Sequence, residues 1–207
     1  MTAKVFAICA VAVALASAPA QGGITLLHEF AGGANDGGNP YGSLTLDGST
    51  LYGMTYYGGD SNGGAVFKMN ADGTGFTLLH EFAGGVSDGR NPWGSLMLNG
   101  STLYGMTLGG GDSARGTVFQ MNTDGTGFEL LHEFAGGVDD GRNPYGSLTL
   151  NGSTLYGMTQ YGGDSNYGTV FSLDIGVVPE PLSLLFFGTG IVGVVGFVAR
   201  RRMRTSA

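Results

Sequence analysis

The sequence predicts an all-β protein of three four-stranded, propeller-like repeats closed by the N-terminal strand. Three blocks recur with a period of 52 residues: LLHEFAGG begins at Leu26, Leu78 and Leu130, NPYGS or NPWGS at Asn39, Asn91 and Asn143, and LYGMT at Leu51, Leu103 and Leu155. A fixed period near 50 residues is typical of repeat architectures with one supersecondary unit per repeat. Short apolar runs alternate with Gly-rich turns in every copy, which favours strands over helices.

The first full repeat spans residues 43–82 and contains four strand-like runs: 43–46, 50–55, 65–69 and 76–82. Asp47-Gly48 lies between the first two runs, where an Asp-Gly pair predicts a hairpin with a type I′ turn. Asn-Gly pairs hold the same place in the other copies, at 99–100 and 151–152. Four successive antiparallel strands with short turns make a β-meander, which is one propeller blade.

The phase of the repeat suggests how the body closes. The second repeat spans residues 95–134, and the third, from 147, ends after its third strand at 170–173. An unpaired copy of the fourth strand, ITLLHEF, stands at residues 24–30, so we expect it to complete the last blade and remove an open sheet edge. Propellers have about 4–8 blades, so three arrangements stay open: a three-unit ring, two chains joined head to tail into six blades, or another threefold β architecture such as a trefoil.

Both ends of the chain lie outside this body. Residues 1–20 read as a secretory signal, with Lys4, an uncharged apolar run and the small-residue site Ala18-Pro19-Ala20. The single cysteine, Cys9, is removed with the signal, which excludes disulfides and thiolate chemistry in the mature chain. The repeat domain spans residues 21–174, and residues 175–207 form a separate C-terminal segment.

The C-terminal segment predicts one transmembrane helix. Residues 182–199 are 18 residues without a charge, followed by Arg200, Arg201, Arg202 and Arg204. This length just spans a bilayer, and the positive-inside rule keeps the arginines cytoplasmic. We therefore expect an exported body held at the inner membrane in the precursor.

The charge of the body excludes some partners. Residues 22–178 contain four Lys and Arg against 15 Asp and Glu, a net charge of −11. This charge opposes nucleic-acid binding, which depends on neutralising phosphates. No cofactor is expected. Oxygen-rich loops are compatible with Ca²⁺, and the sequence leaves metal binding open.

The repeats resemble a known family. The pattern LYGMT…GG…GxVF…DG…LHEF…DGxNPYGSL, present over about residues 24–174, looks like the GloVer (Gloeo/Verruco) tandem repeat of bacterial surface proteins. The resemblance implies a β-propeller-like body and no established activity. The Gly pairs at 58–59, 110–111 and 162–163 are similar to those of kelch blades, as a weaker likeness.

The C-terminus resembles a PEP-CTERM sorting signal. The motif Val178-Pro179-Glu180-Pro181 precedes the apolar run, and the arginine cluster closes it. The resemblance implies recognition by an exosortase, cleavage near the motif, and release of the body to the cell envelope, the cell surface or the extracellular matrix. The alternative is a plain single-span anchor.

One face of the body is the candidate ligand face. Loops that enter the first strand and join the second to the third should gather there. Their recurring residues are Asp36, Asp88, Asp140, Asp60, Asp112 and Asp164, with the aromatics Tyr41, Trp93 and Tyr145. Aromatic rings beside carboxylates suit sugars. The alternative is that Asp, Asn, Pro and Gly simply form turns while the aromatics pack between blades.

Three functions follow from these patterns. The first is a non-catalytic, exosortase-sorted repeat protein with a structural or interaction role. The second is a module that binds exopolysaccharide or another surface glycan through the candidate ligand face. The third is a polysaccharide-active enzyme. It is ranked lowest because the internal symmetry leaves no distinctive acid–base pair. The histidines His28, His80 and His132 share one repeat position, and we expect them to be packed or hydrogen-bonded.

Overall fold

The protein is described by a computed structural model for residues 23–176, so the predicted signal peptide and the sorting motif with its helix and arginines lie outside the described residues. The described residues form strands and no helix. Module 1 contains β1 (Gly37–Gly38), β2 (Thr45–Asp47), β3 (Thr50–Thr55), β4 (Tyr57–Gly58), β5 (Ala65–Asn70) and β6 (Thr77–Glu81). Module 2 contains β7 (Gly89–Pro92), β8 (Met97–Asn99), β9 (Thr102–Gly110), β10 (Thr117–Asn122) and β11 (Glu129–Glu133). Module 3 contains β12 (Gly141–Pro144), β13 (Thr149–Asn151), β14 (Thr154–Gly162) and β15 (Thr169–Asp174).

Each module is an antiparallel meander whose first strand is split in two. In module 2, β7 and β8 both pair with β9, which pairs with β10, and β10 pairs with β11. Module 1 repeats this order, with β3 and β4 in the place of the longer β9. Module 3 stops at β15, which pairs with β14 alone among the described strands. The meander predicted for one repeat is therefore confirmed, while the small strands β1, β7 and β12 were not foreseen.

The first hairpin of each module differs from the predicted turn. Asp47 pairs with Thr50, so the two loop residues are Gly48 and Ser49. Only Gly48 has a positive φ, at 56°, whereas a type I′ turn needs positive φ at both loop residues. A positive φ at the first loop position alone is the requirement of a type II′ turn. The prediction of type I′ was wrong because it placed the turn one residue too early.

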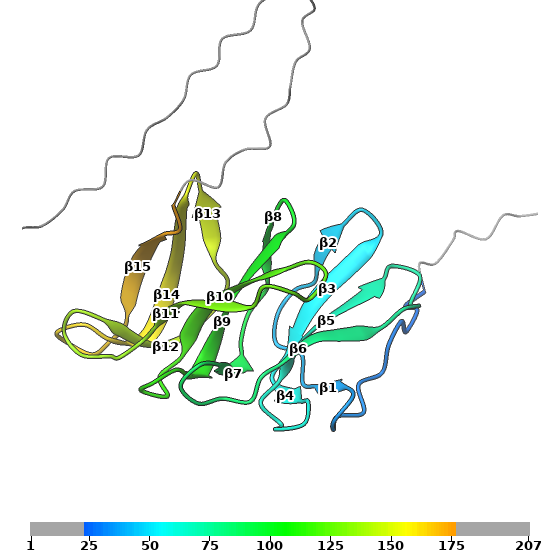
Figure 1. Ribbon diagram of the computed structural model, residues 1–207, viewed down its shortest axis with the longest axis horizontal. Helices are drawn as coiled ribbons and strands as arrows, with labels where there is room; N and C mark the ends of the chain where they lie inside the picture. The colour runs from blue at the N-terminus through cyan, green and yellow to red at the C-terminus, as the bar shows by residue number, and fades with distance from the viewer. Residues whose placement is uncertain (1–22, 177–207) are drawn as a thin grey trace, which may run out of the picture.

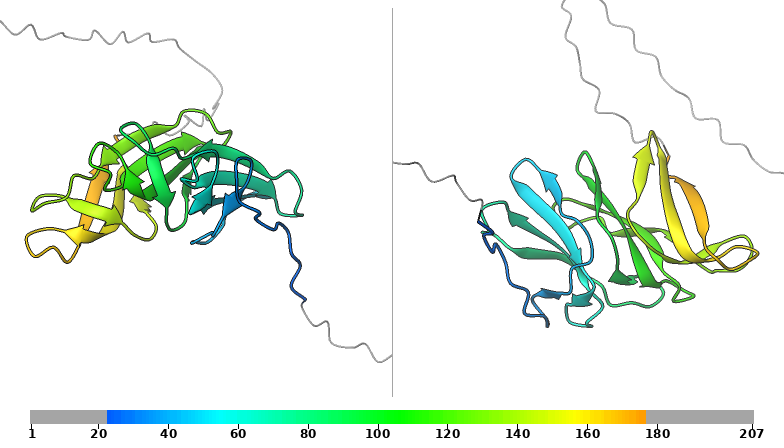
Figure 2. Two further views of the ribbon diagram at one scale, coloured as in Figure 1. Left: turned by 90° about the horizontal axis from the view of Figure 1, so that it is seen from below. Right: turned by 180° about the vertical axis from the view of Figure 1, so that it is seen from behind.

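The modules stack side by side in a curved row (Figures 1 and 2), and the hydrophobic core lies between them rather than inside any one sheet. We call the tyrosine and methionine of the second strand, with the valine of the third, the forward face of a module. The rear face is formed by two leucines, one before the first hairpin and one in the second strand, and by the phenylalanine of the third strand. The forward face of module 1 (Tyr52, Met54, Val66) packs on the rear face of module 2 (Leu96, Leu103, Phe119). The forward face of module 2 (Tyr104, Met106, Val118) packs on the rear face of module 3 (Leu148, Leu155, Phe171).

The predicted closure of the body by residues 24–30 is wrong. This N-terminal segment lies at the module 1 end of the row, at the opposite end from β15 (Figures 1 and 2). The ring centroid of Phe30 is 5.3 Å from that of Phe67, and His28 stacks on Phe76 at 3.9 Å. No sheet closes among residues 23–176. The segment packs on the module that follows it in sequence, because its aromatic side chains fit that module's rear face.

In the described part of the chain, nothing helical has the length and hydrophobicity to cross a membrane. The helix predicted at residues 182–199 falls outside that part and stays a prediction.

Candidate functional site

The predicted aromatic residues form one continuous row that runs across the three modules. Tyr41 stacks on Trp93 with centroids 4.1 Å apart and an angle of 15°, and Trp93 stacks on Tyr145 at 4.9 Å and 29°. Tyr56 meets both Tyr41 and Trp93 edge-on. Both faces of Trp93 are therefore used for packing between modules, whereas among the described residues no ring stacks on the outer face of Tyr41 or of Tyr145.

Glycine allows this row to form. Gly94 lies at φ +104°, and a Cβ added there would sit 1.9 Å from the carbonyl oxygen of Gly146. The N–H of Gly94 donates to the carbonyl of Tyr41 at 2.8 Å. The N–H of Ser43 donates to Ser95 Oγ, and that of Ser95 to Ser147 Oγ. The backbones of adjacent modules thus touch directly, which a side chain would prevent.

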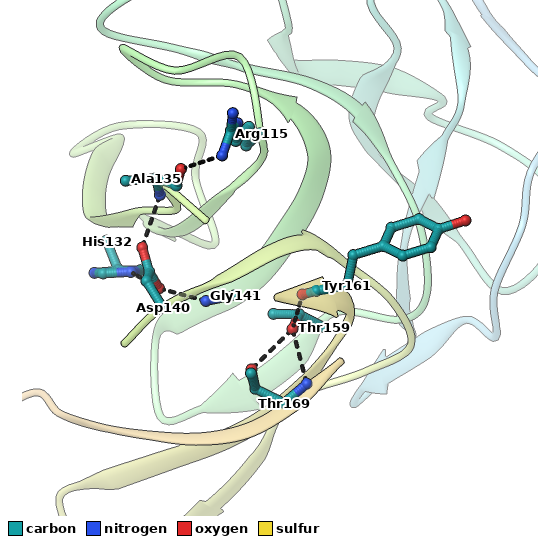
Figure 3. Close-up of polar contacts among 8 residues, drawn as sticks. All are labelled: Arg115, His132, Ala135, Asp140, Gly141, Thr159, Tyr161 and Thr169. Carbon is teal, nitrogen blue, oxygen red and sulfur yellow. Dashed lines mark hydrogen bonds and ion pairs between the residues drawn. The ribbon is translucent and has the colours of Figure 1, made fainter. Parts of the chain in front are cut away.

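We call residues 31–36, 83–88 and 135–140 the junction loops, because each leads into the first strand of a module. The first set of candidate aspartates, Asp36, Asp88 and Asp140, ends these loops and is hydrogen-bonded to them. In the last loop, Asp140 accepts hydrogen bonds from the N–H groups of Ala135 and Gly141, both at 2.7 Å (Figure 3). His132 Nε2 lies 3.3 Å from the same carboxylate, and Arg115 donates to the carbonyl of Ala135. The same pairs recur as His28–Asp36 at 3.0 Å and His80–Asp88 at 2.9 Å.

These contacts change the acidity of two carboxyls. Burial acts to raise the pKa of Asp140, but hydrogen bonds from Ala135, Gly141 and His132 outweigh it and hold that pKa below its usual value. At Asp36 the same opposition, with bonds from Ala31, His28 and Gly37, also lowers the pKa. A carboxylate that is kept ionised and hydrogen-bonded to its own loop stabilises that loop and does not act as a free acid or base.

Two of the second set of candidate aspartates, Asp60 and Asp112, lie on loops held by glutamates, and no described glutamate holds the equivalent loop of Asp164. The N–H of Asp60 donates to Glu81 Oε2 at 2.8 Å, and that of Asp112 to Glu133 Oε2 at 2.6 Å. The two kinds of loop do share one end of each module, as expected, because the N–H of Gly59 donates to the carbonyl of Asp36 at 3.1 Å. Their carboxylates do not converge, however: among residues 23–176 no three His, Cys, Asp or Glu side chains are placed to hold a metal ion.

Two carboxylates do border one hollow. It has a volume of about 280 Å³ and is lined by Val86, Ser87, Phe128, Glu129, Leu130 and Glu133. Glu129 accepts a hydrogen bond from Gln120 Nε2 at 2.9 Å, and Glu133 holds Asp112. Both carboxylates are therefore already hydrogen-bonded within module 2.

A buried hydroxyl in module 3 is also hydrogen-bonded within its own module. Thr159 Oγ1 lies 2.8 Å from both Tyr161 O and Thr169 Oγ1 (Figure 3).

The asparagines of the NP motif have a role that the sequence alone did not reveal. Asn91 Nδ2 donates to Tyr56 O at 2.9 Å and its N–H to Gly63 O, which ties module 2 to module 1. Asn143 repeats this on Leu108 and Arg115, tying module 3 to module 2. Both asparagines have left-handed backbone, with φ of 55° and 53°, which Asn tolerates better than most residues. Their recurrence was visible in the sequence, but their side-chain partners lie 35 residues away in a neighbouring module.

Comparison with known proteins gives one family and a larger number of distantly similar solved structures. The Gloeobacter/Verrucomicrobia repeat matches residues 13–180. A search of curated proteins finds no match. Among solved structures, the chain is similar to one in a nidogen/laminin complex, at 15% identity and a TM-score of 0.39, with 75% of this chain and 65% of that chain covered. It is also similar to the tricorn protease, at 13% identity and a TM-score of 0.36, with 67% and 13% covered. The chain spans less than two thirds of either of those chains.

Proposed function

The chain belongs to the Gloeobacter/Verrucomicrobia repeat family, and we propose that it is a non-catalytic, exported repeat protein that an exosortase sorts to the cell envelope or the extracellular matrix. Its role there is structural: it presents a stiff row of β-modules. The precursor is held in the inner membrane by residues 182–199 until the motif at 178–181 is cleaved.

The observation that carries the non-catalytic part is how the recurring ionisable side chains are used. The aspartate that ends each junction loop is hydrogen-bonded to the histidine before that loop, and it accepts hydrogen bonds from two backbone N–H groups, one at the start of the loop and one just after it. In modules 1 and 2 the glutamate holds a second loop. General acid–base catalysis needs groups that can reach a substrate, whereas these groups stabilise turns.

The order of the sequence signals supports export and sorting. A secretory signal, a repeat body, a Pro-Glu-Pro motif, an apolar run and an arginine cluster follow one another from residue 1 to residue 204. The two prolines block helix extension and leave an extended segment that a protease can grip.

Fractionation of an exosortase-bearing host tests the sorting. We expect the wild-type body in the envelope or the medium. Its measured mass should correspond to a chain that ends near residue 180. Replacing Pro179, Glu180 and Pro181 together by alanine should leave the full-length precursor in the inner membrane. Replacing Asp174 by alanine is a nearby control that should be processed normally. Wild-type protein that retains residues 182–199 in the inner membrane would contradict the proposal and leave the single-span anchor.

A glycan-binding module is the second candidate function. It is favoured by the exposure of Tyr41 and Tyr145, which stay 41% and 44% exposed at the two ends of the aromatic row. A sugar ring could stack on either outer face. A glycan array probed with the wild type and with a Tyr41→Ala, Tyr145→Ala double variant, which removes the two exposed rings and keeps Trp93, tests this candidate. Loss of binding in the variant supports it, and unchanged binding or no binding by the wild type removes it.

A further inference from the structure

We propose that the forward face of module 3 binds the N-terminal segment and the rear face of module 1 of a second copy, so that two chains close head to tail into one body of six modules. This inference rests on how the modules of one chain contact each other. It does not depend on export, sorting or glycan binding.

Among residues 23–176, no module covers the forward face of module 3. Its residues Tyr156, Met158 and Val170 are 41%, 57% and 79% exposed. The equivalent residues Tyr104, Met106 and Val118 are 2%, 2% and 0% exposed because module 3 covers them. An exposed apolar patch of this kind on a soluble domain indicates an interaction surface.

The rear face of module 1 has no preceding module to cover it among the described residues. Leu44 is 52% exposed, whereas its equivalents Leu96 and Leu148 are 4% and 5% exposed against the preceding module. The chain thus ends in two different surfaces that already fit each other twice within the row. A contact between unlike surfaces is heterologous, and it forms a ring when the rotation closes.

The side chains of the N-terminal segment already pack on module 1 as those of a fourth strand pack on the next module. His28 stacks on Phe76 at 3.9 Å and 7°, and His80 of β6 stacks on Phe128 at 3.8 Å and 7°. Phe30 meets Phe67 at 5.3 Å and 66°, and Phe82 meets Phe119 at 5.3 Å and 64°. The segment therefore sits on module 1 just as β6 sits on module 2. What it lacks is the third strand of a preceding module on its other side.

The edge of β15 supplies that strand. In module 1, β5 pairs with β6 in the register Ala65–Glu81, Val66–His80 and Lys68–Thr77. In module 2, β10 pairs with β11 in the same register. The equivalent register for β15 and the segment of a second copy is Thr169–Glu29, Val170–His28 and Ser172–Thr25. Adding a strand to an open sheet edge is a common mode of protein recognition.

The groups around this edge have matching partners in the second copy. The N–H of Phe82 donates to Gly64 O and that of Phe134 to Gly116 O, both at 2.9 Å, so Phe30 would donate to Gly168 O. Glu81 and Glu133 hold the loops at Asp60 and Asp112, so Glu29 would hold the loop at Asp164. Tyr41 of the second copy would stack on the free face of Tyr145, where a sugar ring would compete with it.

The number of modules decides for two copies. Closed propellers contain about 4–8 blades. The described residues of one chain form three modules and those of three chains would form nine, so two chains with six modules are the closed assembly in that range.

Cysteine cross-linking of the full-length chain in mild detergent tests the register. In a Cys9→Ser background, Thr25→Cys and Ser172→Cys are made as separate proteins and mixed under mild oxidation. We expect a covalent dimer in the mixture, because the proposed pair lies across adjacent strands within disulfide range. The Lys68→Cys, Thr77→Cys double variant is the control that must cross-link within one chain.

Oxidation of a chain that carries both Thr25→Cys and Ser172→Cys shows whether the edge of β15 is occupied by the same chain, by one second copy, or by an open series of copies. A covalent dimer that resists further growth supports the closed pair. A cross-linked monomer, an extended ladder of copies, or no product while the control cross-links would each overturn the proposal.

A substitution on the forward face gives a second, independent measurement. Val170→Asp should raise the dissociation constant of the dimer by about 100-fold or more, since it places a charge in an apolar contact. Val86→Asp, at a junction-loop residue that is 66% exposed, should leave the dimer intact. Both variants should keep the far-ultraviolet circular dichroism of the wild type. A wild-type chain that is monomeric at 100 μM, by light scattering, would contradict the proposal.

Discussion

Modules 2 and 3 carry nearly the same strands, yet the forward face of module 2 is buried and that of module 3 is exposed. Tyr104, Met106 and Val118 are buried, while the equivalent residues of module 3 are exposed. The strands are equally well formed in both modules, with full six-residue pairing of β9 with β10 and of β14 with β15. Backbone pairing within a module therefore forms a sheet without a core, and the core appears only where a neighbouring module covers a face. This is the logic of repeat proteins, in which interfaces supply much of the stability.

The largest expected effect comes from placing a charge on the two equivalent valines. Val118→Asp should lower the free energy of unfolding by about 3–5 kcal/mol, because it buries an unpaired carboxylate. Val170→Asp should leave the unfolding of dilute, monomeric protein within about 0.5 kcal/mol of the wild type, as expected for an exposed position. Urea unfolding of both variants measures the difference. Equal losses at the two sites would break the comparison.

A smaller effect is expected along the aromatic row. Gly94 and Gly146 both have positive φ, at +104° and +97°, so alanine strains both by about 1–2 kcal/mol. A Cβ at Gly94 would also collide with the Gly146 carbonyl, whereas one at Gly146 meets no atom within 4 Å among the described residues. We expect Gly94→Ala to cost about 2 kcal/mol more than Gly146→Ala in thermal and urea unfolding of dilute protein. Similar losses would mean that modules 2 and 3 do not touch along this line.

Module 2 also contains a local irregularity that can be repaired. Asn62 Oδ1 accepts from Gly58 N–H at 3.0 Å, and Asn166 Oδ1 from Gly162 N–H at 3.1 Å. Ala114 has the same place in module 2 with φ of 53°, a conformation that is unfavourable for alanine. Ala114→Asn should therefore stabilise the protein by about 1 kcal/mol. Asn62→Ala is the reciprocal variant and should destabilise by a similar amount, and a stabilising Asn62→Ala would contradict the account of this loop.

The smallest effect concerns acid. The pKa of Asp140 is lower in the folded chain than in the unfolded chain, so its contribution to stability is complete above the unfolded value of about 3.9 and is lost as the pH falls through the folded value. Thermal stability of the wild type should fall as the pH drops below about 4. Asp140→Asn should be less stable at pH 7 and lose less stability on acidification.

The control for the acid prediction is Asp139→Asn, at an exposed position beside Asp140. It removes one charge and keeps the bonds to Ala135 and Gly141. Its melting temperature should follow the pH profile of the wild type. A flattened profile in this variant, with an unchanged one in Asp140→Asn, would contradict the assignment.

Sequence reasoning located the strands well because their signals are local. The prediction at residues 50–55 matches β3, and that at 65–69 matches β5 to within one residue. The hairpin turn was misplaced because Asp-Gly and Gly-Ser are both acceptable turn pairs, and the strand register decides between them. The Asn91–Tyr56 and Asn143–Leu108 ties could not be predicted, since they join modules whose relative placement is a tertiary property.

The error over closure is the most instructive one. A fourth strand such as β6 has two partners, because its backbone pairs with β5 while His80 and Phe82 pack on the next module. The repeat phase in the sequence indicates the backbone partner alone, which is why it predicted that residues 24–30 lie on module 3. Within one chain only the packing partner is in reach, so the segment lies on module 1. The same dual role is what makes a second copy the natural occupant of β15.

Hydrogen exchange of the β15 backbone, compared with that of β10, tests most directly whether a second copy completes module 3. The two strands have the same length and the same pairing on one side, and only β10 has a fourth strand on the other. We predict that β15 exchanges faster than β10 in dilute protein and becomes as protected as β10 when the concentration is raised. Exchange of β15 that stays fast and independent of concentration would contradict the account.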